Sequence, residues 1–181
     1  MNRRLDIQKT YKLYINGKFP RTESGRYFPI NDKDGNLSAN MCRASRKDFR
    51  EAVKAARSAA AGWSSRTAYN RGQILYRAAE TLEGRKEQFI RELITFEMSQ
   101  KKATTEVETA LDRLVYYAGW ADKYQTLFSS VNPVSSSHYN FSVPEYQGVI
   151  ALIAPDDNPL LGLVSLIAPI LSGGNTVVCL A

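Results

Sequence analysis

The stretch from Gly148 to Ala181 constrains the fold most, because it reads as a strand, a helix and a strand in close succession. The run GVIALIA is apolar at every position, which is typical of a parallel strand buried on both faces. Asn158 before Pro159 predicts an N-cap and a first helical residue, and Gly173 with Gly174 predicts a helix end that needs positive φ. The run TVVCL predicts a second, parallel strand reached by a right-handed crossover. The chain is therefore predicted to be α/β.

The first part of the chain predicts short strands followed by a helix. The run YKLYINGKFP alternates apolar and polar residues, and Asn16-Gly17 within it is a hairpin-turn signal. Ser45 and Asp48 have the spacing of a capping box. Apolar residues then recur at helical spacing, so we expect a helix that ends near Ala61.

Three further helices are expected after the first. Thr67 precedes one apolar helical face, and a second apolar pattern follows Gly84. Thr105 and Glu108 have the spacing of another capping box at the start of a long apolar pattern. We expect this last helix to reach Tyr124 or beyond.

The chain divides by composition into three segments. Residues 1–130 hold the first strands and the helices, residues 131–147 read as a loop and an extended strand interrupted at Pro144, and residues 148–181 form the strand, helix, strand unit. The net charge is +6, yet every Lys and Arg lies before residue 124. Because the cations alternate with Asp and Glu along helical segments, we expect solvated helix faces and no nucleic-acid partner.

Composition excludes several classes of protein. An apolar fraction of 44% with 23% charged residues is ordinary for a globular chain. Two cysteines and one histidine, His138, are too few for a disulfide framework, a zinc site or a Ser-His-Asp triad. The longest apolar stretch, 159–171, is too short to span a bilayer, and the first residues lack the apolar core of a signal peptide. We expect a cytoplasmic chain without a membrane partner.

Two groups of reactive side chains allow a structural and a functional interpretation. Cys179 lies in an apolar strand, where a thiol has a raised pKa, and Cys42 lies near Arg43 with no histidine close in sequence. We expect both thiols to be structural. Asp156 and Asp157 could form an acid/base pair, but their place before a predicted helix favours capping and stabilisation of the helix dipole.

An aromatic stretch in the predicted long helix also has two interpretations. Tyr116, Tyr117, Trp120 and Tyr124, with Lys123, could stack on the bases of a single-stranded nucleic acid. Their helical spacing favours packing in the core or between subunits, which is the interpretation we prefer. A nucleic-acid-binding domain, whose affinity would fall steeply with salt, ranks last.

Three strings of the sequence resemble the aldehyde dehydrogenase superfamily in the same order. They are RTAYNRGQILYRAAETLE, LDRLVYYAGWADKY and PDDNPLLGLVSLIAPILSGGNTVV. The likeness runs from about Tyr11 to Ala181 and includes Gly62-Trp63, a G-V-x-x-x-I-x-P strand at Gly148–Pro155 and a G-N-T-V-V strand at Gly174–Val178. Within the superfamily, the chain most resembles the second dehydrogenase-like unit of family 16 proteins.

The resemblance implies the N-terminal part of a Rossmann-like coenzyme domain for NAD or NADP, with an incomplete parallel sheet. The family oxidises aldehydes to carboxylic acids through a thiohemiacetal on a cysteine, with a glutamate as general base and an asparagine at the oxyanion. That cysteine, that glutamate and the glycine-rich cofactor segment come later in the family than residue 181. The resemblance therefore implies a fragment that is inactive alone.

The family positions do not carry over unchanged. Those near the cofactor fall here on Ile153, Pro155, Asp156 and Asp157. The oxyanion asparagine aligns with Asp157, whose negative charge would repel a developing oxyanion. The lysine that contacts the adenine ribose aligns with Leu180, which can donate no hydrogen bond. No catalytic residue is therefore assigned, and dinucleotide binding is expected to be weakened.

The resemblance also implies a partner. In the family, the extended segment that corresponds to Tyr139–Tyr146 belongs to an oligomerisation hairpin, so we expect a homo-oligomer or a catalytic dehydrogenase unit to pair there. Two functions stay open. One is the N-terminal portion of an NAD(P)-dependent aldehyde dehydrogenase-like oxidoreductase, and the other is a non-catalytic scaffold derived from a dehydrogenase fold, a pseudoenzyme.

Overall fold

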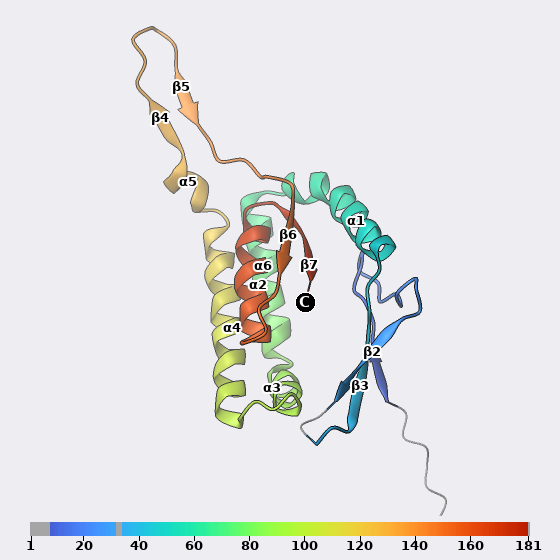
Figure 1. Ribbon diagram of the computed structural model, residues 1–181. Helices are drawn as coiled ribbons and strands as arrows, with labels where there is room; N and C mark the ends of the chain where they lie inside the picture. Colours follow the sequence, from blue (N-terminus) through green and yellow to red (C-terminus); the bar gives the residue numbers. More distant parts are fainter. Residues whose placement is uncertain (1–7, 32–33, 181) are drawn as a thin grey trace, which may run out of the picture. The chain divides into compact units, whose positions relative to one another are not determined.

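The computed structural model describes residues 8–31 and 34–180 and contains two compact units, Met1–Ala56 and Arg57–Ala181. The first unit holds strands β1 (Lys9–Tyr11), β2 (Tyr27–Asn31) and β3 (Leu37–Cys42) and the start of helix α1 (Arg46–Ser64). The strand order is β1-β3-β2, with β1 parallel and β2 antiparallel to β3 (Figure 1).

The turn predicted at Asn16-Gly17 is present. Asn16 has φ 53° and Gly17 has φ 71°, and the backbone N–H groups of Ile15 and Lys18 each donate to the other residue's carbonyl oxygen, at 3.0 and 3.1 Å. Two consecutive positive φ values identify the turn type that suits a two-residue hairpin, and Asn and Gly adopt them most readily.

The capping box at the start of α1 is also confirmed. The Ser45 backbone N–H donates to Asp48 Oδ2 at 2.8 Å, and the Asp48 N–H donates to Ser45 Oγ at 3.3 Å. The helix continues to Ser64, slightly beyond the predicted end near Ala61. Small alanine side chains fill its last turns, and they favour helix over other backbone structure.

The second unit is mostly helical and ends in a short parallel sheet (Figure 1). Its elements are α2 (Ala68–Glu83), α3 (Lys86–Thr95), α4 (Gln100–Trp120), α5 (Tyr124–Phe128), β4 (Ser130–Asn132), β5 (Asn140–Ser142), β6 (Val149–Ile153), α6 (Pro159–Ser172) and β7 (Thr176–Leu180). Among the described residues, no helix is both long enough and apolar enough to cross a membrane.

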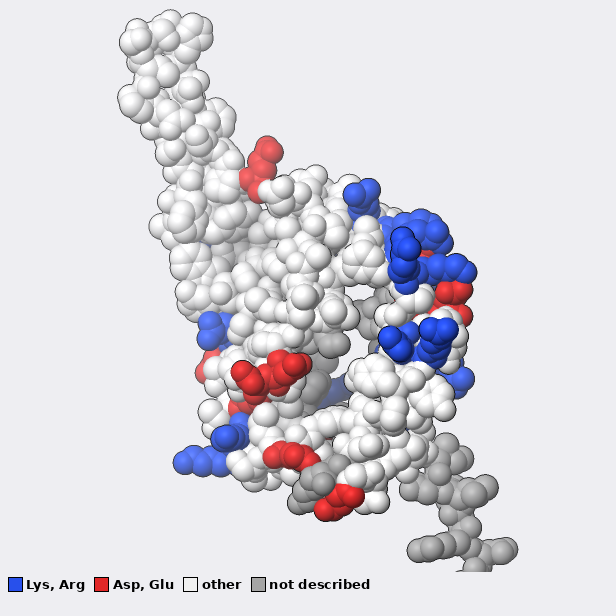
Figure 2. Space-filling view, viewed as in Figure 1, with Lys and Arg blue, Asp and Glu red and all other residues white. Residues whose placement is uncertain are grey.

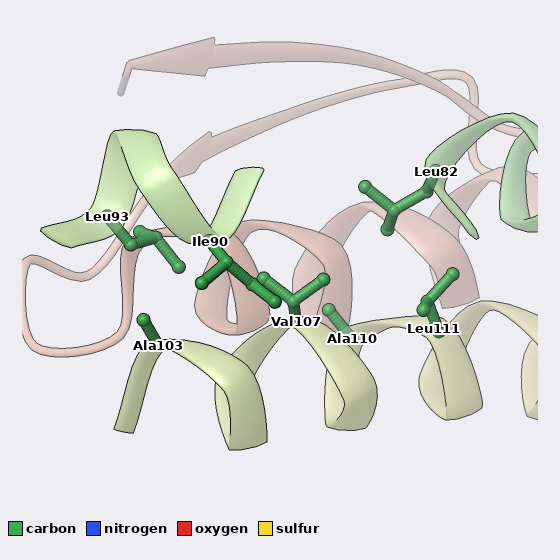
Figure 3. Packing of buried hydrophobic residues seen from close by; sticks show 7 residues of the cluster. All are labelled: Leu82, Ile90, Leu93, Ala103, Val107, Ala110 and Leu111. Carbon is green, nitrogen blue, oxygen red and sulfur yellow. The ribbon is translucent and has the colours of Figure 1, made fainter. Parts of the chain in front are cut away.

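Helix α4 is the centre of this unit, because it packs against α2, α3 and α6. Its buried face carries residues at helical spacing that meet apolar side chains of α2 and α3 (Figure 3). The buried cluster consists of Leu82, Ile90, Leu93, Ala103, Val107, Ala110 and Leu111. Small residues on α4 let the neighbouring helices approach closely.

The long helix begins earlier than predicted. Thr105 and Glu108 lie inside α4, so the capping box assigned to them is wrong. The N-cap is Ser99, whose side chain accepts from the backbone N–H of Lys102 at 3.4 Å. A capping pattern in the sequence does not exclude a further helical turn before it. Here that turn contains Ala103, which is fully buried. The helix also ends before Tyr124, where the separate helix α5 starts.

The predicted strand, helix, strand unit is present. Strands β6 and β7 are parallel, with Val149 opposite Thr176 and Ile153 opposite Leu180. However, β6 is not buried on both faces, because Ala151 is exposed and Ile153 is 74% exposed. Side chains alternate between the faces of a strand, and the described residues cover only one face of β6.

The segment between the helices and this sheet forms a hairpin. Strand β4 pairs antiparallel with β5, with Ser130 opposite Ser142 and Asn132 opposite Asn140. The Asn132 side chain donates to Asn140 Oδ1 at 2.9 Å and to Ser142 Oγ at 3.1 Å. The hairpin surface carries no Lys, Arg, Asp or Glu (Figure 2), so its pairing depends on backbone bonds and neutral side chains.

Candidate functional site

The candidate site is the loop between β6 and the N-terminus of α6, which holds most of the sequence-predicted cofactor positions. Pro155, Asp156, Asp157 and Asn158 are all exposed there. Asn158 is the N-cap residue by position, but its side chain makes no capping hydrogen bond. The role predicted for its side chain is therefore wrong, and neither aspartate is the capping acceptor that the structure shows.

The capping acceptor is Glu106 of helix α4. Its Oε1 accepts from the backbone N–H groups of Leu160 and Leu161 at 2.9 and 3.2 Å. Glu106 is only 5% exposed, and its Oε2 is buried without a hydrogen-bond partner among the described residues. A negative charge at this position accepts hydrogen bonds from two N–H groups that have no acceptor within α6. It also interacts favourably with the positive end of the helix dipole.

The opposite end of α6 is held by side chains from α2 and α1. The Nε of Arg71, a buried residue, donates to the Ser172 carbonyl oxygen at 3.0 Å, and the indole Nε1 of Trp63 donates to that of Leu171, also at 3.0 Å. Of the two predicted terminating glycines, only Gly174 has positive φ, at 83°. A cation and an N–H donor thus satisfy the last carbonyls of α6.

A close approach of strand loop and helix fixes the position of this site. A Cβ built on Gly162 would lie 2.3 Å from Pro155 Cγ. Only glycine, which has no Cβ, avoids this overlap. The N–H of Gly162 also donates to the Asn158 carbonyl oxygen at 2.6 Å. The loop therefore packs directly against the first turn of α6.

The sheet brings two of the sequence-predicted positions together. Ile153 and Leu180 are opposite each other at the carboxyl ends of β6 and β7, and both are exposed, at 74% and 63%. At their other ends the strands are joined by Asn175, whose Oδ1 accepts from the N–H groups of Gln147 and Gly148. Ligands of open α/β sheets bind beyond the carboxyl strand ends, so this is the edge at which a cofactor would be expected.

The residues present at this edge do not fit the phosphates of a dinucleotide. Phosphate binds at a helix N-terminus through free backbone N–H groups and a favourable dipole. Here the two first-turn donors already bind the Glu106 carboxylate, and the exposed Asp156 and Asp157 add negative charge just before the helix. Leu180 supplies neither a donor nor a charge for the ribose.

Neither cysteine has the environment of a reactive thiol. Cys42 is buried at the end of β3, and burial raises the pKa of the Cys179 thiol, as predicted, against a smaller opposing effect of the Ala154 backbone N–H. The described part of the chain has no group of three or more His, Cys, Asp or Glu that could hold a metal ion.

The aromatic stretch of α4 packs upon itself. The rings of Tyr116 and Tyr117 meet edge to face with centroids 5.2 Å apart, and those of Tyr116 and Trp120 lie 6.0 Å apart. Tyr116 is nevertheless 54% exposed. The stretch thus forms a partly exposed aromatic surface on α4.

Sequence reasoning missed Glu106 and Arg71, which hold the two ends of α6. A signal was present, since each is a charged residue on the helix face that its apolar neighbours mark as buried. A buried charge is expected to have a specific partner. The partners of Glu106 and Arg71 lie far along the chain, so the sequence alone did not identify them.

Comparison with known proteins gives one consistent result at the level of sequence. A model described as "Aldehyde dehydrogenase family" matches residues 20–180. The human mitochondrial 10-formyltetrahydrofolate dehydrogenase is 33% identical over 95% of this chain, and aldehyde dehydrogenase family 2 member B4 of Arabidopsis thaliana is 34% identical over 92%. The chain spans 19% and 31% of the lengths of these two relatives.

Comparison with solved structures agrees. PnpE in complex with nicotinamide adenine dinucleotide superposes with a TM-score of 0.89 and 28% identity, over 96% of this chain and 35% of that one. An NAD⁺ complex of aldehyde dehydrogenase from Bacillus cereus gives a TM-score of 0.86 and 27% identity, over 94% of this chain and 35% of that one. The chain thus matches about a third of these complete folds.

Proposed function

Because this chain belongs to the aldehyde dehydrogenase family, we propose that it contributes the first part of the coenzyme-binding domain to an NAD(P)-dependent oxidation of aldehydes to carboxylic acids. The observation that carries the proposal is the agreement of the backbone with an NAD complex of the same fold over 96% of the chain. The finer likeness to the second unit of family 16 proteins stays a prediction.

We further propose that residues 1–181 do not oxidise an aldehyde by themselves. Neither cysteine suits a nucleophile, since Cys42 is buried in a strand and the pKa of Cys179 is raised by burial. Asp157 stands where the family's oxyanion asparagine is expected, and its carboxylate would oppose charge that develops in the transition state. The chemistry then depends on groups outside these residues.

The alternative is a scaffold role, in which the dehydrogenase fold serves assembly without catalysis. Two side chains favour it, Asp157 at the oxyanion position and Leu180 at the ribose position. The crowded N-terminus of α6, with the Glu106 carboxylate on its donors, favours it as well.

An activity and binding measurement on the 181-residue chain tests the first proposal. We expect no aldehyde-dependent reduction of NAD⁺ or NADP⁺, and calorimetric binding of NAD⁺ weaker than about 1 mM. A complete aldehyde dehydrogenase assayed in parallel provides the positive control. Turnover by the chain alone would contradict the proposal that its own residues are insufficient.

The mass of the natural product separates the two functions. Intact mass and peptide mapping from source cells would reveal whether the chain is part of a longer protein. A longer product with a downstream cysteine and glutamate in family context supports the oxidoreductase, whereas a product that ends at residue 181 supports the scaffold.

For assembly, we propose that the β4–β5 hairpin joins this chain to a second copy of itself. Val131, Tyr139 and Phe141 are 64%, 73% and 59% exposed, and no charged side chain interrupts this surface (Figure 2). Contiguous exposed apolar surface of this kind marks interaction sites, and the strand edges of the hairpin can pair with another strand. A separate catalytic dehydrogenase unit would be the other outcome.

A further inference from the structure

The positive charge of the chain is concentrated in its first unit. Residues 1–56 hold 13 of the 24 Lys and Arg but only 6 of the 18 Asp and Glu, so they carry +7 while the whole chain carries +6. The remaining residues together carry a net charge of −1. The basic character of the chain is therefore a property of the first unit.

Part of this charge forms a row along α1. Arg46, Arg50 and Lys54 follow one another at intervals of four residues, and all three are exposed. Residues four apart share a helix face and lie about 6 Å apart along the axis. We call these three residues the basic row, and Figure 2 shows Lys and Arg side chains gathered over α1. Asp48 and Ala56 on the opposite face are buried, so the basic row faces solvent.

The carboxylates near the basic row do not neutralise it. Glu51 is the only exposed acidic residue of α1, and its Oε1 lies 3.1 Å from Lys54 Nζ and 3.4 Å from Arg50 Nε. One carboxylate thus serves two cations, and Arg46 has no ion-pair partner among the described residues. Asp48, the other acidic residue of α1, is buried and accepts hydrogen bonds from neutral donors. The basic row therefore presents uncompensated positive charge.

The stability of α1 does not explain where these cations lie. Arg43 and Arg46 are at the N-terminus of the helix, whose positive dipole end repels cations, whereas the last turn of α1 has no basic residue. The backbone N–H of Arg43 also donates to the Arg26 carbonyl oxygen at 3.0 Å, and both of these arginines are exposed. An anion bound at this end of the basic row would relieve the repulsion.

We propose that the basic row binds an acidic, extended segment of a partner polypeptide. Successive side chains on one face of an extended strand are about 6.6 to 6.8 Å apart, which is close to the spacing of the basic row. Carboxylates at alternate positions of such a segment can therefore meet successive cations. Arg46 and Arg50 suit this partner, because a planar guanidinium binds a carboxylate through two parallel hydrogen bonds.

Two other anionic partners fit this surface less well. A nucleic-acid backbone carries a charge at every phosphate, so it would also bring negative charge against Glu51 and against Glu23, which pairs with Lys47. A polypeptide can place neutral residues opposite these carboxylates. A helix that lies on a membrane inserts its apolar face, but Ala56 on that face of α1 is buried in the protein.

The test is the binding of a fluorescein-labelled peptide of alternating Glu and Ser to the full 181-residue chain, measured by fluorescence anisotropy. We expect saturable binding that weakens as salt is added, because salt screens exposed charges. The double variant Arg46→Gln/Arg50→Gln should bind at least about threefold more weakly, since it removes two of the exposed ion pairs. A neutral peptide of alternating Gln and Ser should not bind.

Arg77→Gln/Arg91→Gln is the matched control. It removes the same charge from exposed arginines of α2 and α3, in the second unit. We expect this variant to bind the peptide as the wild type does. An equal loss in both double variants would mean that net charge alone sets the affinity, and the assignment to the basic row would be wrong.

Circular dichroism checks that each variant is folded. Should Arg46→Gln/Arg50→Gln fail to fold, the single variant Arg50→Gln takes its place, and wild-type affinity in that variant would contradict the proposal. A wild-type chain that shows no saturable binding of the acidic peptide would contradict it as well.

Three further outcomes would assign the basic row to a different partner and overturn the proposal. Tighter binding of an oligothymidylate of equal charge would indicate a nucleic acid. Tighter binding of vesicles of equal parts phosphatidylcholine and phosphatidylserine would indicate a membrane surface. Slower or faster sedimentation of Arg46→Gln/Arg50→Gln than of the wild type would indicate a second copy of the chain. None of these measurements needs an aldehyde or a nicotinamide, so their result is separate from that of the proposed oxidoreductase function.

Discussion

At the scale of single residues, α6 depends on charged side chains that come from other helices. Arg71 donates from Nη1 to the Arg66 and Ser64 carbonyl oxygens, at 2.6 and 3.4 Å, in addition to its bond from Nε to Ser172. One guanidinium thus satisfies the ends of two helices and the turn that links α1 to α2. The planar fork of donors makes this possible, and a lysine could not reproduce it.

We predict that Arg71→Met lowers the free energy of unfolding by about 2 to 4 kcal/mol, because it leaves buried carbonyl oxygens without donors. Arg77→Met is the control, since Arg77 lies on the same helix but its side chain is 82% exposed. Urea unfolding followed by circular dichroism measures both. Equal stabilities for the two variants would show that the buried bonds of Arg71 do not matter.

A second residue with several partners is Asp48, in the first unit. Its Oδ2 accepts from Thr22 Oγ1 at 2.6 Å and from the Ser45 N–H, and its Oδ1 accepts from the Glu23 N–H at 3.1 Å. Burial raises the pKa of this carboxyl, but the hydrogen bonds outweigh that effect, so its pKa lies below the ordinary value. The carboxylate form is therefore favoured in the folded chain.

This direction fixes the pH dependence. A depressed folded-state pKa contributes stability that is present above the unfolded pKa of about 3.9 and is lost as the pH falls through the folded pKa. We therefore expect the stability difference between wild type and Asp48→Asn to shrink below about pH 4. Glu51→Gln is the control, because the Glu51–Lys54 pair is at the surface, where an ion pair contributes little stability, so its difference from wild type should be smaller than that of Asp48→Asn. A difference for Asp48→Asn that stays constant with pH would contradict this account.

At the scale of elements, one glycine sets how closely a loop can approach a helix. Gly162 permits Pro155 to pack on the first turn of α6, so the loop that carries Asp156 and Asp157 begins against that helix. The identity of residue 162 therefore positions the whole candidate site, although it has no functional group.

We predict that Gly162→Ala costs about 1 to 3 kcal/mol, because the added methyl group overlaps the Pro155 ring. Gly119→Ala makes the same change inside α4, where the nearest atom to the new Cβ is the flexible Lys123 Nζ at 3.7 Å, and it should stabilise by about 0.5 to 1 kcal/mol. Thermal unfolding of both variants is the measurement. Stabilisation by both would mean that the loop can move aside at no cost.

At the scale of the whole molecule, the chain exposes large apolar side chains on and next to its β4–β5 hairpin. Leu127 and Phe128 of α5, the helix that directly precedes β4, are also 62% and 69% exposed. Surfaces of this kind on a folded chain favour association.

We predict that Phe141→Ser shifts the 181-residue chain toward the monomer in sedimentation velocity. Phe49→Ser is the control, because Phe49 of α1 is 57% exposed, nearly as much as Phe141, but lies in the other unit. We expect that variant to sediment as the wild type does. If Phe49→Ser dissociated the assembly and Phe141→Ser did not, the interface would lie outside the hairpin.

Local signals predicted much of the architecture. The turn at Asn16-Gly17 and the cap formed by Ser45 and Asp48 appear where the sequence indicated, and the second helix begins directly after Thr67, as expected. Each depends on residues within three positions of one another, so the rest of the chain has little influence. The capping box assigned to Thr105 and Glu108 was wrong because the same spacing also occurs inside a helix.

Hydrophobic periodicity and turn residues act locally, so they were enough to predict the first helix and the parallel strand, helix, strand unit. Which group caps α6, in contrast, depends on how the helices pack. Asn158 and Asp157 were the nearest acceptors in sequence, yet Glu106 holds the donors, because packing of α4 against α6 brings its carboxylate to them. A contact across 54 residues leaves no local pattern, and burial strengthens the bond of the distant charge over that of an exposed neighbour.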